Sequence, residues 1–260
     1  MPHPAFRPEE HGFAFINAWP LNLEQTAELR QTLSRSAQTA ARDVRASIGG
    51  FDISGMVQRV ADMWADANLP THYGMCGGMA FAAADYFRAG TPLPRGKDWS
   101  DLPLDDSPRS RALRDYLWQR QVESFVTNAP QLLAWMVMLH MPLPFAGPGW
   151  LLERTKAQWR TLKAKIDAGE PWPICLIGSS RSPFDNHQVL AIGYDETSPD
   201  TSVISLYDMN SPGRAQTITL DMRGCELIAF ETSPSPARGQ LRGFFVEQYT
   251  PQPPPILPAA

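Results

Sequence analysis

Apolar residues recur at helical spacing through the first two thirds of the chain. After Ser54, which suits the start of a helix, they fall every three or four positions from Met56 to Trp64. Within 109–141, Pro130 is expected to begin a second helix, because proline fits the first turn of a helix but not its interior. Helices are expected over 23–35, from Ser54 through Trp64, and over 76–89, 109–141 and 150–168, while 12–18 is a strand or a loop and 91–108 and 142–149 are loops.

From residue 173 onward the pattern changes to short apolar runs rich in β-branched residues, which is typical of strands. Helices followed by strands predict an α+β architecture. We expect a single domain over 1–250, with an N-terminal region (1–70), a helical part (71–170) that includes a segment at 91–150, and a β part (171–250). Residues 251–260 contain five prolines and form an extended or disordered tail. The expected strands are 173–178, 187–194, 202–208, 215–221, 226–231 and 241–249.

Cys76 stands between a glycine-rich approach and the helix expected over 76–89. A thiol at a helix N-terminus feels the positive end of the helix dipole, which favours the nucleophilic thiolate. The flanking Gly77 and Gly78 permit close approach of other backbone or of a ligand. The alternative is a small buried apolar side chain, which is the role of most free cysteines.

His187 follows a polar turn and begins one expected strand, and Asp208 ends the next. If these strands pair, the carboxylate of Asp208 or the amide of Asn210 reaches the imidazole and fixes its tautomer and orientation. Taken singly, the histidine fits a turn, and Asp208 and Asn210 fit turn formation equally well. Together with Cys76 they predict a nucleophile, a base and an orienting group, with Asp208 preferred to Asn210.

This order of cysteine, histidine and acid resembles that of the papain-like cysteine peptidases, and more closely the bacterial branch similar to the peptidases that cut double-glycine leader peptides. That branch carries Gly-His-x-Val-x-Val-x-Gly-Tyr-Asp on one strand and Asp-Pro at the end of the next. Residues 186–195 read Asn-His-Gln-Val-Leu-Ala-Ile-Gly-Tyr-Asp, and 207–210 read Tyr-Asp-Met-Asn. The resemblance covers 70–90 and 155–212. It implies a papain-like fold, in which a helical N-terminal half with the nucleophile helix packs on an antiparallel sheet or barrel.

The chain departs from this family at the oxyanion donor. The family carries a glutamine six residues before the cysteine, and here that position is Pro70, which has no donor. Loss of one such donor costs about 2.7–4 kcal/mol of transition-state stabilisation. The replacements to consider are Asn17, His72 and Tyr73.

The resemblance implies a thiol-dependent acyl-transfer enzyme, first of all a cysteine peptidase or amide hydrolase acting on a peptide or acyl substrate. A transferase using the same residues is an alternative. So is a papain-like module that binds without cutting, associated with a toxin or secretion system, and Pro70 favours that alternative.

Composition removes several other classes of function. A net charge of −4 with scattered basic residues gives no general attraction to nucleic acid. Three widely spaced cysteines make no disulfide framework, and no metal-ligand motif or phosphate-binding loop is present, so neither a metal nor a cofactor is expected. The longest apolar run, 132–139, is too short for a membrane span, and the first ten residues lack the apolar stretch of a secretory signal. Cytoplasmic residence is therefore expected, with secretion by another route and the oligomeric state left open.

Overall fold

The computed structural model describes residues 4–47, 72–94, 105–141 and 144–258. The helix expected after Ser54 and the position of Pro70 lie outside these residues. Among the described residues, no helix combines the length and apolar character needed to cross a bilayer. The helices are α1 (Pro8–His11), α2 (Leu23–Ser47), α4 (Cys76–Arg88), α5 (Pro108–His140) and α6 (Pro148–Asp167).

The predicted helices that fall within the described residues are confirmed, with two differences. Helix α2 continues to Ser47, well past the expected end at Arg35. The expected break at Pro130 is wrong, because α5 runs without interruption from Pro108 to His140. Proline removes the hydrogen bond to the carbonyl four residues earlier, which here belongs to Val126. Val126 lies on an exposed side of the helix, where water can take the place of the missing N–H.

In the described part of the chain, the six main strands form one antiparallel sheet in the order β7-β6-β5-β4-β3-β8. All six coincide with expected strands to within a few residues, so the α+β class is confirmed. The expected strand or loop at 12–18 is irregular chain, and it leads into β1 (Trp19–Pro20), which pairs with β2 (His72–Tyr73). The main strands are β3 (Trp172–Gly178), β4 (His187–Ser198), β5 (Thr201–Tyr207), β6 (Ala215–Asp221), β7 (Ile228–Glu231) and β8 (Leu241–Val246), with a short 3-10 turn η1 (Pro183–Asp185) before β4.

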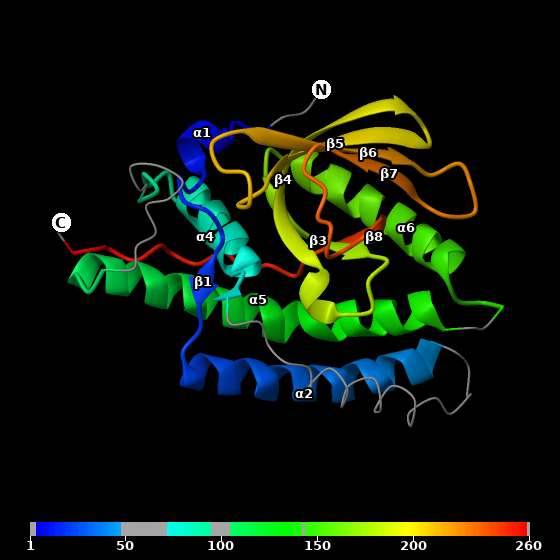
Figure 1. Cartoon of the computed structure of the whole chain (residues 1–260). Helices are drawn as coiled ribbons and strands as arrows, with labels where there is room; N and C mark the ends of the chain where they lie inside the picture. The colour runs from blue at the N-terminus through cyan, green and yellow to red at the C-terminus, as the bar shows by residue number, and fades with distance from the viewer. Residues whose placement is uncertain (1–3, 48–71, 95–104, 142–143, 259–260) are drawn as a thin grey trace.

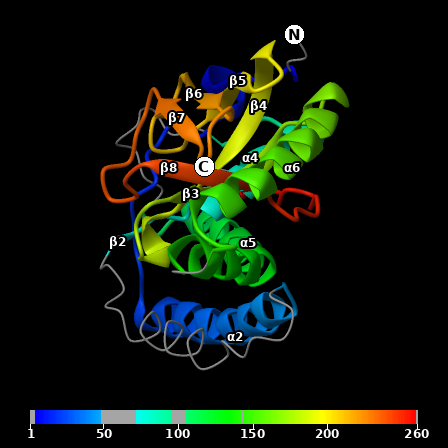
Figure 2. The same cartoon turned by 90° about the vertical axis from the view of Figure 1, so that its right-hand side faces the viewer.

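The helices lie in layers beside the sheet. Figures 1 and 2 both show α2 on the far side of α5, with α5 between α2 and the rest of the molecule. Helix α4 packs on β3 and β4, and the main hydrophobic core lies between this helix and the sheet. A second core joins the later half of α5 to β3 and β8. The start of α4 is thereby held next to the start of β4.

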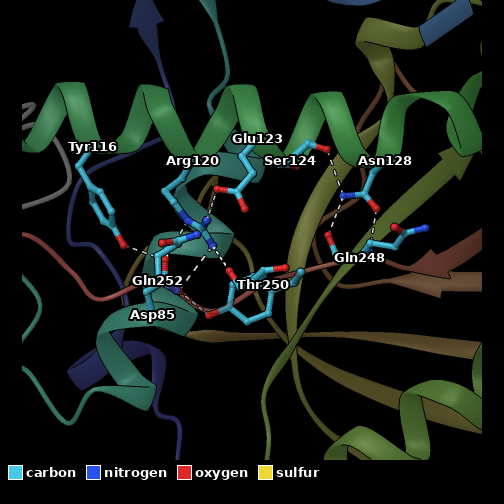
Figure 3. A network of polar contacts seen from close by, with 10 residues as sticks. Asp85, Tyr116, Arg120, Glu123, Ser124, Asn128, Gln248, Thr250 and Gln252 are labelled. Carbon is cyan, nitrogen blue, oxygen red and sulfur yellow. Dashed lines mark hydrogen bonds and ion pairs between the residues drawn. The ribbon is translucent and has the colours of Figure 1, made fainter.

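A buried polar network connects α4, α5 and the chain that follows β8 (Figure 3). The Arg120 guanidinium of α5 pairs with Asp85 of α4 at 2.8 Å, and both side chains are almost completely buried. Tyr116 and Tyr249 donate hydrogen bonds to the same carboxylate at 2.7 and 2.6 Å. Arg120 also donates to the carbonyl of Thr250 at 3.0 Å. The network therefore holds helix α4, which begins at Cys76, in place relative to α5.

The proline-rich tail is extended, as expected, and it packs along these helices. Gln252 donates its backbone N–H to Asp85 at 2.8 Å. Arg109 of α5 donates to the carbonyl of Pro258 at 3.0 Å, and Leu257 packs against the main core. The tail thus adds contacts to both α4 and α5 and does not hang free.

Replacing Arg120 with methionine should destabilise the protein by about 3–5 kcal/mol, because it leaves the Asp85 carboxylate buried without its cation. Urea denaturation measures the free energy of unfolding. The matched control is Lys156→Met, which removes the solvent-exposed pair with Glu153 and should cost about 1 kcal/mol or less. Equal losses in the two variants would contradict the structural role given to the buried pair.

Candidate active site

Cys76 is the first residue of α4, at the positive end of the helix dipole. Met75 provides no side-chain cap, and the first turn contains no acidic residue. The first turn therefore contains no negatively charged side chain that would compete with a Cys76 thiolate for the positive end of the helix dipole. The sulfur is partly exposed, and Cys76 is a free thiol.

The two glycines after Cys76 are required by close packing. A Cβ on Gly78 would lie 2.3 Å from the carbonyl oxygen of Leu117, so α4 and α5 could not approach as they do. A Cβ on Gly77 would lie 2.1 Å from the side-chain oxygen of Gln188. The Gly78 N–H, one of the free donors of the first turn, is satisfied by Gln121 at 2.9 Å. The glycine pair thus brings Cys76 up against α5 and β4.

His187 begins β4, and its Nε2 lies 2.8 Å from the Oδ1 atom of Asp208, which directly follows β5. Pairing of β4 with β5 places Leu190 opposite Tyr207 and so aligns the two side chains. The backbone N–H of Asn210 donates to the same Oδ1 at 2.9 Å and holds the carboxylate in place. The imidazole and the carboxylate are both largely buried.

Asn210 also contacts the ring, with its amide nitrogen 3.3 Å from Nε2 of His187. Nε2 carries at most one hydrogen, and the nearer Asp208 carboxylate can only accept it. The Asn210 amide is therefore a second contact beside the Asp208 hydrogen bond. Since Nε2 faces Asp208, Nδ1 is the nitrogen available to the sulfur.

The charges around His187 favour the imidazolium form. Burial lowers the pKa of His187, but Asp208 and the neighbouring Cys76 outweigh this effect and raise it to about 10. Burial likewise acts to raise the pKa of Asp208, yet His187 holds it below its usual value, helped by the Asn210 N–H and by Arg238. The pair is therefore an imidazolium beside an ionised carboxylate near neutral pH.

Asn17 lies beside the approach to Cys76. Its amide nitrogen would lie 2.6 Å from a Cβ on Gly74, two residues before the cysteine. The β1–β2 pairing explains this position, because it sets Trp19 opposite Tyr73. Asn17 and Cys76 border the same cavity. An amide donor therefore borders the same cavity as the thiol.

The other two oxyanion candidates take part in this pairing through their backbone. His72 is opposite Pro20, and Tyr73 is opposite Trp19. Their side chains lie outside the described part of the structure, as does Pro70. Of the three candidates, Asn17 alone has a described side chain, and that side chain borders the cavity.

A cavity of about 250 Å³ opens beside Cys76 and His187. One wall of it is formed by residues of α5, which lies in the segment 91–150 that the family resemblance does not cover. The lining is apolar at Phe125, Ala129, Leu132, Phe184 and Phe245 and polar at Asn17, Asn128, Asp185, Asn210 and Ser235. A second cavity of about 190 Å³ lies against His187 and Asp208 and is lined by Arg238. In the described ranges, no three His, Cys, Asp or Glu side chains are grouped so as to hold a metal ion.

Several residues of the site were not expected from the sequence. The Gln188 side-chain oxygen lies 3.7 Å from the Cys76 sulfur, and its amide nitrogen donates to Ser124 of α5 at 2.6 Å and to Glu247. Arg238 is buried and acts on Asp208. Gln188 is adjacent to His187 in sequence. Its partners Glu247 and Ser124, and the Arg238 that acts on Asp208, are all distant in sequence. The unusually polar Gln188 within an apolar run was the one available signal.

Comparison of this chain with protein-family models, with curated proteins and with solved structures found no match. Function is therefore inferred from the arrangement of Cys76, His187 and Asn17 around the cavity and from the hydrogen bond between His187 and Asp208.

Proposed function

We propose that the protein is a thiol-dependent acyl-transfer enzyme, a cysteine peptidase or amide hydrolase, with Cys76 as nucleophile, His187 as base and Asp208 as orienting acid. The observation that carries the proposal is the position of His187, between the Cys76 thiol and the Asp208 carboxylate, at the wall of a cavity that can admit a substrate.

In the resting state, the Cys76 proton passes to Nδ1 of His187, and a thiolate–imidazolium pair forms. The helix dipole and the imidazolium stabilise the thiolate, and Asp208 stabilises the imidazolium through the hydrogen bond to Nε2. A pKa near 10 for His187 supports a charged ring at neutral pH.

The thiolate then attacks the acyl carbon of a substrate in the cavity, and the carbonyl oxygen becomes an oxyanion. The backbone N–H of Cys76, at the free end of α4, is one donor for it. The Asn17 amide is the second, in place of the glutamine that Pro70 replaces. With this donor in place, Pro70 no longer favours a module that only binds.

When the intermediate collapses, the imidazolium of His187 protonates the leaving group, the bond to that group breaks, and the acyl group stays on the sulfur as a thioester. His187 is then neutral and removes a proton from water, whose oxygen attacks the thioester carbon. Collapse of this second intermediate releases the acid and restores the thiolate–imidazolium pair.

The order of the elements supports a papain-like arrangement as part of the proposal. The cysteine begins a helix, the histidine begins a strand of an antiparallel sheet, and the acid follows the neighbouring strand. The mixed polar and apolar lining of the cavity suits a peptide side chain or an acyl group. Transfer to an amine or hydroxyl in place of water requires the same residues.

Alkylation of Cys76 by iodoacetamide across pH tests the proposal. Fast modification at about pH 6, lost in His187→Ala, is expected for an activated thiolate. The exposed Cys225 should be replaced by serine to remove background reaction, while the buried Cys175, whose pKa is raised by burial, should stay unmodified. Slow alkylation that rises only toward about pH 8.5 and does not depend on His187 would overturn the proposal.

A further inference from the structure

Glu247, directly after β8, is a completely buried carboxylic acid that the proposed mechanism does not use. Its backbone is held at both ends, since its N–H donates to the Pro173 carbonyl at 3.0 Å and its carbonyl accepts from the Trp172 indole at 2.9 Å. Of its two carboxyl oxygens, Oε1 accepts from Gln188, and Oε2 has no partner within the described structure. None of the ion pairs among the described residues involves Glu247.

Gln188 joins this acid to the reacting sulfur. Its amide nitrogen faces Glu247 and Ser124, and its oxygen faces the Cys76 sulfur at 3.7 Å. The amide lies tightly against Gly77, because a Cβ on Gly77 would overlap its oxygen. A rotation of the amide by half a turn exchanges its two ends without changing the space it fills.

We propose that the charge on Glu247 decides which end of the Gln188 amide faces Cys76, so that neutral Glu247 supports the thiolate and ionised Glu247 opposes it. This inference rests on the proposed function of Cys76. It makes Gln188 and Glu247 positioning residues, which act on the reaction through the sulfur.

Hydrogen-bond chemistry determines the two arrangements. An ionised carboxylate can only accept, so it holds the amide NH₂ and turns the carbonyl of Gln188 toward the sulfur. That carbonyl can accept an S–H but repels a thiolate. A neutral carboxylic acid can donate its O–H to the carbonyl, which leaves the NH₂ free to donate to the thiolate. The Ser124 hydroxyl is both donor and acceptor and fits either arrangement.

The surroundings of Glu247 bring the two charge states close in energy near neutral pH. Burial without a cation raises the pKa of Glu247 to about 8, although the Gln188 hydrogen bond opposes the change. Among the described residues, the titratable and charged groups coupled to this region are Cys175 on β3, Cys76 on α4, His187 on β4 and Arg238.

The expected consequence is a change in Cys76 reactivity that the Cys–His pair alone would not produce. The thiolate–imidazolium pair and its neutral thiol–imidazole form hold the same number of protons, so pH does not alter their ratio between the two titrations of the pair. Ionisation of Glu247 does alter it, because it withdraws an N–H from the thiolate. The gain or loss of a hydrogen bond to a charged group corresponds to a change of about tenfold or more.

The test measures two quantities, the rate of iodoacetamide alkylation and the ultraviolet absorbance of the thiolate, in protein carrying Cys225→Ser. Both are measured from about pH 6 to pH 9.5, a range that spans the Glu247 transition. We expect the wild-type rate to fall by about tenfold through a transition near pH 8. Glu247→Gln, which keeps the shape and cannot ionise, should give a flat profile. Gln188→Leu, which breaks the connection to the sulfur, should also give a flat profile. The control Glu153→Gln removes an exposed carboxylate and should retain the wild-type transition.

A flat wild-type profile, or an unchanged transition in Glu247→Gln, would overturn the inference while leaving the proposed function intact. Slow alkylation at about pH 6 in every variant, without dependence on His187, would overturn both. Thermal unfolding of each variant checks whether the protein is folded at the pH of each measurement.

Discussion

Replacing Cys76 with alanine should reduce acyl transfer by about 10⁶-fold, because loss of a catalytic nucleophile removes the covalent pathway altogether. The fold should change little, since Cys76 is partly exposed and its hydrogen bond to Gln188 is long, at 3.7 Å. The measurement is cleavage of a quenched fluorescent peptide library, followed by turnover of the best substrate by the variant.

The two other cysteines provide controls for this variant. Cys225→Ala alters an exposed side chain and should leave both turnover and stability unchanged. Cys175→Ala removes a buried side chain that also borders the cavity, so it should lower the free energy of unfolding without removing covalent chemistry. Turnover that persists in Cys76→Ala and disappears in Cys175→Ala would show that Cys175, and not Cys76, is the nucleophile.

Replacing Asp208 with asparagine should reduce turnover by about 10⁴-fold, the loss seen when the orienting acid of such a triad becomes an amide. The amide cannot supply the negative charge that raises the pKa of His187, and it can hold the ring in the wrong tautomer. Asn210→Ala should have a much smaller effect. The Asn210 amide nitrogen lies 3.3 Å from Nε2 of His187, and Asp208 already accepts the hydrogen bond that Nε2 donates. A larger loss from Asn210→Ala than from Asp208→Asn would make Asn210 the third member.

The same substitution should change how stability depends on pH. The lowered pKa of Asp208 contributes stability above its unfolded value of 3.8, which is lost as pH falls through the folded pKa. The raised pKa of His187 contributes stability that is complete below 6.5 and is lost as pH rises through about 10. The excess stability of the wild type over Asp208→Asn should therefore be greatest between these two unfolded values and decline on either side. Urea denaturation at several pH values measures it, and a constant difference would contradict the charged pair.

The local elements could be predicted because they depend on short-range patterns. Apolar spacing identified α4, α5 and α6, and runs of β-branched residues identified the six strands. Cys76 at a helix start and His187 at a strand start follow from the same patterns, since both positions depend on neighbours in sequence. The break at Pro130 was wrong because the packing of α5 against α2 and α4 outweighs the local preference of one proline.

The order of the strands and the surroundings of each side chain depend on residues that are distant in sequence. Asn17 comes to border the same cavity as Cys76 because β1 pairs with β2, and these strands are far apart in sequence. Asp85 and Arg120 meet because α4 packs on α5. Neither pairing carries a signal in a window of ten or twenty residues.

Patterns in the sequence were enough to predict the class of fold, the position of a thiol at a helix N-terminus, and the succession of cysteine, histidine and acid along the chain. Only the packed fold shows that Asp208 is nearer to His187 than Asn210 is, that Asn17 borders the cavity, and that Glu247 is buried behind Gln188. The physical reason is that hydrogen-bond geometry and the cost of burying a charge depend on which elements pack together, and packing joins parts of the chain that the sequence keeps far apart.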